Sequence, residues 1–133
     1  MLSASLLLVH YDPTKELVLS CDSSSYGIGC VLLQINGTGN LQPVAYASRT
    51  LSDTECRYAQ VEREVLACFW GTLKMQQHVF GRHITIETDH KPLLGLLGET
   101  KAILPPSLGR VQHWALTLAG YDYSLVYRPG KEM

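Results

Sequence analysis

The chain has 133 residues, of which 46% are hydrophobic and 17% are charged. This length and composition are typical of one globular domain with a buried core, and they argue against intrinsic disorder. The net charge is −1, from 11 basic and 12 acidic residues, so the chain lacks the basic excess of a self-sufficient duplex-binding protein. Any affinity for nucleic acid must then come from bound metal, from local patches or from neighbouring domains.

The cysteine spacing and the amino-terminal residues indicate which cellular compartment and which kinds of site to expect. The four cysteines show no C-x-x-C spacing and no zinc-type Cys/His cluster. We therefore expect buried free thiols in an intracellular, reducing compartment, the cytoplasm or the nucleus. The opening run MLSASLLLVH is too short to span a bilayer and lacks the basic flank of a signal peptide, so no membrane partner is expected. The thiols are those of Cys21, Cys30, Cys56 and Cys68.

Residues 17–34, LVLSCDSSSYGIGCVLLQ, predict two strands joined by a short turn. Both arms are apolar, and the serines and glycines between them favour a tight reversal of the chain. Asp22 ends the first arm, in a setting where a carboxylate is costly unless something pairs with it. Two interpretations stay open: Asp22 caps the turn, or it helps to bind a divalent cation.

A third strand is predicted to follow directly. The segment 36–40, NGTGN, is a strong hairpin signal, so the second strand should turn back into a strand at 42–48. Pro43 lies near the start of this strand and cannot donate a ladder hydrogen bond, which favours an edge position. The first three strands therefore form an antiparallel meander.

A long helix is predicted next, over residues 53–79. Ser52 and Glu55 have the spacing of a capping box, and Gly81 is placed to end the helix. Gly71 lies inside the helix, where it could permit a close approach to the sheet. Apolar residues at helical spacing form the expected buried stripe, namely Tyr58, Val61, Val65, Cys68, Phe69 and Thr72.

The second half of the chain predicts two more strands separated by helices. The expected elements are a strand at 83–88, a short helix at 91–97, a loop at 98–106, a helix at 108–118 and a strand at 121–127. Crossovers through helices imply parallel neighbours. The fold class is therefore α/β, with a mixed five-stranded sheet, three strands antiparallel and two parallel, flanked by helices.

Acidic residues are predicted to gather at one edge of this sheet. Asp22 and Asp89 both stand at the C-terminal ends of strands, where ligands of open α/β sheets collect. The long helix offers Glu62 and Glu64, and periodicity alone does not choose between them. Three such carboxylates would repel one another unless hard cations neutralised them, as in a two-metal phosphodiesterase. The alternative is that these are scattered structural acids.

Four stretches, in order along the chain, resemble the RNase H domain of gypsy-type LTR retrotransposon reverse transcriptases. They are LVLSCDSSSYGIGCVLLQ, QPVAYASRTLSDTECRYAQVEREVLA, ITIETDHKPLLGLL and RVQHWALTLAGYDYSLVYRPGK. Each is weak alone, but the ordered set covers nearly the whole chain and is highly specific. The resemblance implies an RNase H-like fold and a nuclease that cuts the RNA strand of an RNA–DNA hybrid with two Mg²⁺ or Mn²⁺ ions.

The resemblance also implies the catalytic and metal-binding residues. Asp22 matches the first-strand aspartate, the EREVLA segment selects Glu64 over Glu62, and Asp89 matches the aspartate that ends the fourth strand. The family's fourth acidic ligand follows its Tyr-x-Pro-Gly-Lys segment, so residues 1–133 are expected to be a single RNase H-like domain lacking the helix that carries it. The first turn reads Asp-Ser-Ser where the family more often has Asp-Ala-Ser.

Four further residues are candidates for contact with a nucleic-acid substrate. Ser23, Ser24, His90 and Arg49 are candidate contacts to nucleic acid; turn capping by the serines, a turn role for His90 and a solvated charge for Arg49 are the structural alternatives. The resemblance implies an RNA–DNA hybrid as substrate, and polymerase and connection domains and an integrase in a parent Pol polyprotein. A catalytically silent, retroelement-derived domain that binds protein or nucleic acid is the alternative function.

Overall fold

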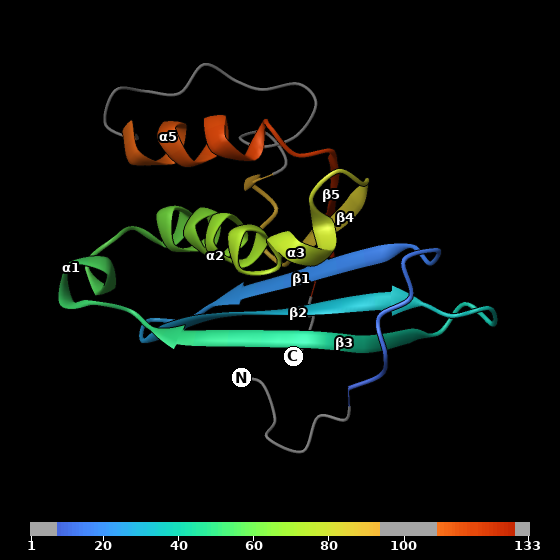
Figure 1. Ribbon diagram of the computed structural model, residues 1–133. Coiled ribbons are helices and arrows are strands. Elements are labelled where there is room, and N and C mark those ends of the chain that lie inside the picture. The colour runs from blue at the N-terminus through green and yellow to red at the C-terminus, as the bar shows by residue number, and fades with distance from the viewer. Residues whose placement is uncertain (1–7, 94–108, 130–133) are drawn as a thin grey trace.

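The computed structural model describes residues 8–93 and 109–129. Five strands form one sheet in the order β3-β2-β1-β4-β5, and α2, α3 and α5 lie over one face of it (Figure 1). The strands are β1 (Leu17–Ser23), β2 (Gly27–Ile35), β3 (Leu41–Thr50), β4 (Ile84–Thr88) and β5 (Tyr123–Tyr127). The helices are α1 (Asp53–Cys56), α2 (Gln60–Lys74), α3 (Gln76–Val79) and α5 (Gly109–Leu118).

The sheet has the predicted mixed pairing. β1 pairs antiparallel with β2 and β2 with β3, whereas β1 pairs parallel with β4 and β4 with β5. The predicted hairpin is confirmed, because the side chain of Asn36 accepts hydrogen bonds from the backbone of Thr38 and Asn40, and Gly39 has a φ of +86°. β3 is an edge strand, as Pro43 predicted. The strands β2 and β3 both extend beyond their predicted ends.

The hydrophobic core lies between the sheet and α2. Leu19 and Cys30 point into it from the strands, and Val65 and Cys68 from the helix, all almost fully buried. Gly71 lets α2 approach the sheet as predicted, because a Cβ there would lie 3.1 Å from the Cβ of Cys30. The remaining residues of the predicted stripe are buried or partly buried against this core.

The single helix predicted over 53–79 is wrong, because the structure divides it into α1, α2 and α3. Residue 59 has extended backbone angles, φ −62° and ψ 157°, and its N–H donates to the carboxylate of Glu62 at 2.8 Å, which caps a new helix start. A second break falls at Met75, where φ is −97° and ψ is 16°. Gly81 follows α3 with a φ of +82°, consistent with its predicted role as a helix stop.

Only some of the elements predicted after residue 90 lie within the part of the chain that the structure describes. The short helix at 91–97 falls largely, and the loop at 98–106 entirely, outside the described residues. The last predicted helix and strand are confirmed as α5 and β5, although β5 begins at Tyr123 because 119–121 form the turn that links them. Across residues 8–93 and 109–129, no helix combines the length and apolar character needed to cross a membrane.

The prediction that all four thiols are buried is wrong for one of them. Cys21, Cys30 and Cys68 are buried in the core, but Cys56 is exposed at the end of α1, where the helix stops one turn after it starts. Burial raises the pKa of the Cys30 thiol to about 12. A thiol in that state has almost no reactive thiolate at neutral pH.

We expect Ellman's reagent at pH 8 to modify one thiol of the native chain rapidly, and peptide mapping to identify it as Cys56. All four thiols should react once the chain is unfolded in guanidinium chloride, which serves as the control. A Cys56→Ser variant should lose the rapid phase. Rapid modification of two or more thiols in the native chain would contradict the burial described above.

Candidate metal centre

Parallel pairing of β1 and β4 brings two aspartates to the same edge of the sheet. Ser20 lies opposite Glu87 in the register, so Asp22 and Asp89 occupy matching positions two residues further along. Neighbouring strands lie about 4.8 Å apart. The chain leaves β1 for β2 on one side and reaches β4 on the other, so this edge is the switch point at which open α/β sheets bind ligands.

The third carboxylate comes from α2. Glu64 lies one helical turn before Cys68, on the face of α2 that packs against the sheet, and only 4% of it is exposed. Because α2 contacts β1 and β2, this position places the side chain over the end of β1. The hydroxyl of Ser23 donates a hydrogen bond to Oε1 of Glu64.

The structure brings Asp22, Glu64 and Asp89 together as one cluster. One carboxylate oxygen from each lies within 4.8 Å of those of the other two. Glu64 is buried, Asp22 is half-buried and Asp89 is exposed, so the cluster opens to solvent on one side. Hard oxygen ligands at this spacing suit Mg²⁺ or Mn²⁺, and a divalent cation offsets the repulsion between the three carboxylates. The residues present therefore fit a divalent metal centre.

Glu62, the alternative that periodicity could not exclude, contacts the start of α2 and α5. Its Oε1 accepts the backbone N–H of Ala59, and its Oε2 lies 2.8 Å from NH1 of Arg110 on α5. The Arg110 guanidinium also lies over the Tyr58 ring, 4.2 Å from its centroid. Glu62 thus caps α2 and joins it to α5, which leaves Glu64 as the helix carboxylate of the cluster.

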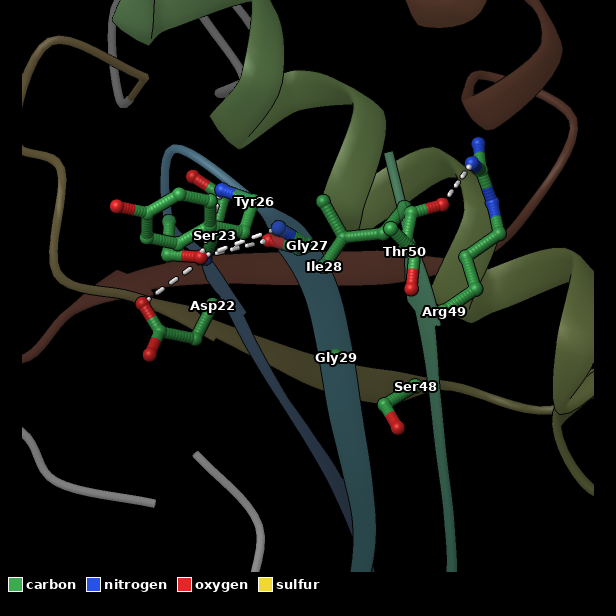
Figure 2. A pocket seen from close by; sticks show the side chains of 10 residues that line it. Asp22, Ser23, Tyr26, Gly27, Ile28, Gly29, Ser48, Arg49 and Thr50 are labelled. Atoms are coloured by element: carbon green, nitrogen blue, oxygen red, sulfur yellow. Dashed lines mark hydrogen bonds between the residues drawn. The ribbon is translucent and has the colours of Figure 1, made fainter. Parts of the chain in front are cut away.

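An open pocket of about 500 Å³ is lined by one carboxylate of the cluster, that of Asp22 (Figure 2). Asp22, Ser23 and Tyr26 stand at one end of it, and Arg49 and Thr50 stand at the other. Between these two ends the lining includes Gly27 and Gly29, which have no side chain, and Ile28. Ten residues line it: Asp22, Ser23, Ser24, Tyr26, Gly27, Ile28, Gly29, Ser48, Arg49 and Thr50.

Three of the four predicted substrate contacts line this pocket, with different local roles. Ser24 builds the turn, since its Oγ lies 3.1 Å from the backbone N–H groups of Tyr26 and Gly27 that donate to it. Arg49 forms a forked pair with Glu55, at 2.8 and 2.9 Å, and this hydrogen bonding lowers the pKa of the Glu55 carboxyl to about 2. Ser23 contacts the carboxylate cluster directly.

His90 does not line the pocket. It lies in the turn after β4, where its backbone N–H donates to Oγ1 of Thr88 at 3.1 Å and its carbonyl accepts from the N–H of Leu93. Its Nδ1 is buried without a hydrogen-bond partner. A turn position is the structural alternative expected from the sequence.

Tyr26 is a pocket residue that the sequence analysis did not single out. It stands at the tip of the β1–β2 turn with 77% of its surface exposed, beside Asp22. A tyrosine so exposed has little part in the core. The signal was present in the sequence, since a large aromatic residue within a serine- and glycine-rich turn has no helix or strand to pack against.

Solved structures with this fold define the class of the domain. RNase H1 from the halophilic archaeon Halobacterium salinarum NRC-1 aligns with a TM-score of 0.60 at 19% identity, over 86% of each chain. The foamy viral protease-reverse transcriptase in complex with dsDNA aligns with a TM-score of 0.71 at 18% identity, over 95% of this chain and 26% of that one. The fold is RNase H-like.

Sequence similarity to known proteins shows the family to which the chain belongs. Residues 12–121 match the RNase H-like domain found in reverse transcriptase, and the chain belongs to this family. It is 35% identical to the Pol polyprotein from transposon opus of Drosophila melanogaster over 119 residues, 89% of this chain. Over 131 residues, 98% of the chain, it is 34% identical to that from transposon gypsy of the same species. The chain spans 11% and 12% of these two polyproteins.

Proposed function

We propose that this domain hydrolyses the RNA strand of RNA–DNA hybrids at the Asp22–Glu64–Asp89 cluster, with two Mg²⁺ or Mn²⁺ ions. The observation that carries the proposal is the convergence of three carboxylates from β1, α2 and the end of β4 within 4.8 Å. Family membership and the RNase H-like fold support the same reaction. Two cations in such a site activate the attacking water and stabilise the leaving oxygen of the phosphodiester.

The chain's own residues supply the position and the charge. Asp22 and Asp89 lie at the ends of adjacent parallel strands, so the sheet sets the separation of their backbones. Glu64 is held from the opposite side by a helix packed on the core. Rigid elements of this kind keep carboxylates in place before the reaction, which lowers the cost of assembling the charged site.

The pocket beside Asp22 is the proposed path of the nucleic acid. Its hydroxyl-bearing rim suits sugar and phosphate oxygens, and the exposed ring of Tyr26 suits contact with a base or sugar face. The net charge of −1 means that this contact surface and the cations must supply much of the affinity. LC11-RNase H1, a solved structure with the same fold, is in complex with an RNA/DNA hybrid.

We expect Tyr26→Ala to weaken hybrid binding about fivefold, or about 1 kcal/mol, because it removes an aromatic contact surface. Fluorescence anisotropy with a labelled hybrid measures this, in an Asp89→Asn background so that substrate is not consumed. Tyr26→Phe keeps the ring and is the matched control, with affinity close to that of the parent. Equal affinities for the alanine and phenylalanine variants would remove Tyr26 from the proposed path.

Cleavage of a hybrid labelled on each strand in turn tests the reaction. We would compare the chain with a version that carries the segment following Tyr-x-Pro-Gly-Lys in gypsy-type relatives, because the family's fourth carboxylate lies there. RNA-strand cleavage in Mg²⁺ or Mn²⁺ that Asp89→Asn abolishes is the expected result. Absence of cleavage from both folded forms would overturn the proposal and favour a catalytically silent binding domain.

The same family membership supports a place in a larger protein. We propose that the domain works inside the cell beside polymerase and connection domains, with an integrase in the same Pol polyprotein. Co-purification of the domain with a separately expressed polymerase-connection fragment tests the first of these contacts. Failure of the two fragments to associate at micromolar concentration would argue against a stable interface between them.

A further inference from the structure

We propose that Ser23 is a positioning residue that sets the placement of Glu64 relative to Asp22, and so tunes metal affinity. This inference rests on the proposed function. Ser23 contacts both carboxylates with separate donors: its backbone N–H lies 2.9 Å from Oδ1 of Asp22, and its hydroxyl donates to Oε1 of Glu64. One residue therefore joins the carboxylate of a strand to the carboxylate of a helix.

The hydrogen bond to Glu64 has a clear physical effect. Glu64 is only 4% exposed, so few water molecules can stabilise or orient its carboxylate. A hydroxyl donor to a charged acceptor is stronger than a neutral hydrogen bond and fixes the direction of the acceptor. A carboxylate has about four lone-pair sites, so one such group can accept a hydrogen bond and also bind a cation.

The β1–β2 turn does not require this hydroxyl. Ser24 accepts the backbone N–H groups of Tyr26 and Gly27, and the N–H of Ser24 donates to the carbonyl of Gly27 at 2.9 Å. The backbone N–H of Ser23, which contacts Asp22, is present whatever the side chain is. Removal of the Ser23 hydroxyl should therefore affect Glu64 while it leaves the turn and Asp22 in place.

The contribution of the hydroxyl can be separated from that of the turn. Ser23→Ala keeps the Cβ and the backbone N–H and removes only the side-chain oxygen that contacts Glu64. The hydroxyl is then a feature that adjusts the centre in this chain, and partners of metal ligands typically change metal affinity by about tenfold or more when they are lost.

Titration of the ¹⁵N-labelled chain with MgCl₂, followed by amide chemical shifts near the cluster, measures the affinity without any cleavage. We expect Ser23→Ala to raise the Kd for Mg²⁺ about tenfold. Ser23→Thr restores a hydroxyl and should return the Kd to within about twofold of the parent value. Ser25→Ala, an equal change at an exposed position of the same turn, should leave the Kd unchanged.

Two outcomes would overturn the inference. If Ser23→Ala binds Mg²⁺ as the parent does, or if Ser23→Thr is as weak as Ser23→Ala, the hydroxyl does not position Glu64. Because the parent chain is titrated in the same series, the two proposals fail differently. A parent that shows no Mg²⁺ binding at the cluster removes the metal centre itself, whereas equal binding by parent and alanine variant removes only the role of Ser23.

Discussion

Glu64→Gln is expected to lower RNA-strand cleavage by at least about a thousandfold, with the fold retained. The change removes one negative charge from the cluster and so weakens cation binding. A thousandfold loss of rate corresponds to about 4 kcal/mol of lost transition-state stabilisation. The variant is nearly equal in shape, and the carboxamide oxygen can still accept a hydrogen bond from Ser23. Single-turnover cleavage of the hybrid, together with circular dichroism, measures both effects.

Glu62→Gln is the matched control for this variant, two residues away on the same helix. Glutamine can still accept the backbone N–H of Ala59, but it loses the ion pair with Arg110 at 2.8 Å. We expect the free energy of unfolding to fall by about 1 kcal/mol or less, and the cleavage rate to stay close to that of the parent. The opposite pattern, an inactive Glu62→Gln and an active Glu64→Gln, would contradict the assignment of the helix carboxylate.

Gly27→Ala is expected to destabilise the domain by about 1–3 kcal/mol. Gly27 opens β2 opposite Thr50, and a Cβ at this position would lie 2.9 Å from the backbone carbonyl oxygen of Arg49. A rigid backbone atom cannot give way as a flexible side chain can, so the first pairs of the β2–β3 ladder must shift. Urea denaturation measures the loss, and the pocket beside Asp22 should widen or distort at the same time.

Gly37→Ala provides the comparison for this second prediction. It is the same substitution in the next hairpin, where a Cβ meets nothing within 4 Å. We expect its free energy of unfolding in urea to stay within about 0.5 kcal/mol of the parent value. A Gly27→Ala variant as stable as Gly37→Ala would show that the start of β2 yields easily, and would exclude close packing as the reason for glycine there.

The sheet and the positions of two of the three clustered carboxylates could be predicted because they depend on local patterns. Alternating apolar residues and the NGTGN turn define the meander, and crossovers through helices require parallel pairing of the later strands. Once β1 and β4 are parallel neighbours, Asp22 and Asp89 must meet at one edge. No long-range information is needed for that step.

The helix residues were harder to predict, because their roles depend on contacts distant in sequence. Glu62 and Glu64 differ by two positions, and both are buried. Periodicity could not tell that Arg110, 48 residues later, would pair with Glu62. The same glutamate explains the missed helix break, since a carboxylate that caps residue 59 starts a new helix where the apolar pattern predicts a continuous one.

The environments of Ser23 and Cys56 also could not be predicted from local sequence patterns. In the sequence, Ser23 is one of three turn serines, and only the approach of α2 to the end of β1 gives its hydroxyl a carboxylate partner. Cys56 lies in an apparently helical run, and it is exposed because α1 ends beside it. Each outcome was decided by how two elements pack, which composition and spacing do not record.

Anomalous diffraction from crystals soaked in MnCl₂ tests the central claim most directly, because it locates the cation without any assumption about the reaction. Anomalous density between the carboxylates of Asp22, Glu64 and Asp89 is the predicted result, and it should vanish in crystals of Glu64→Gln but persist in crystals of Glu62→Gln. Density absent from the cluster at saturating Mn²⁺, or carboxylates that point away from one another, would contradict the metal centre.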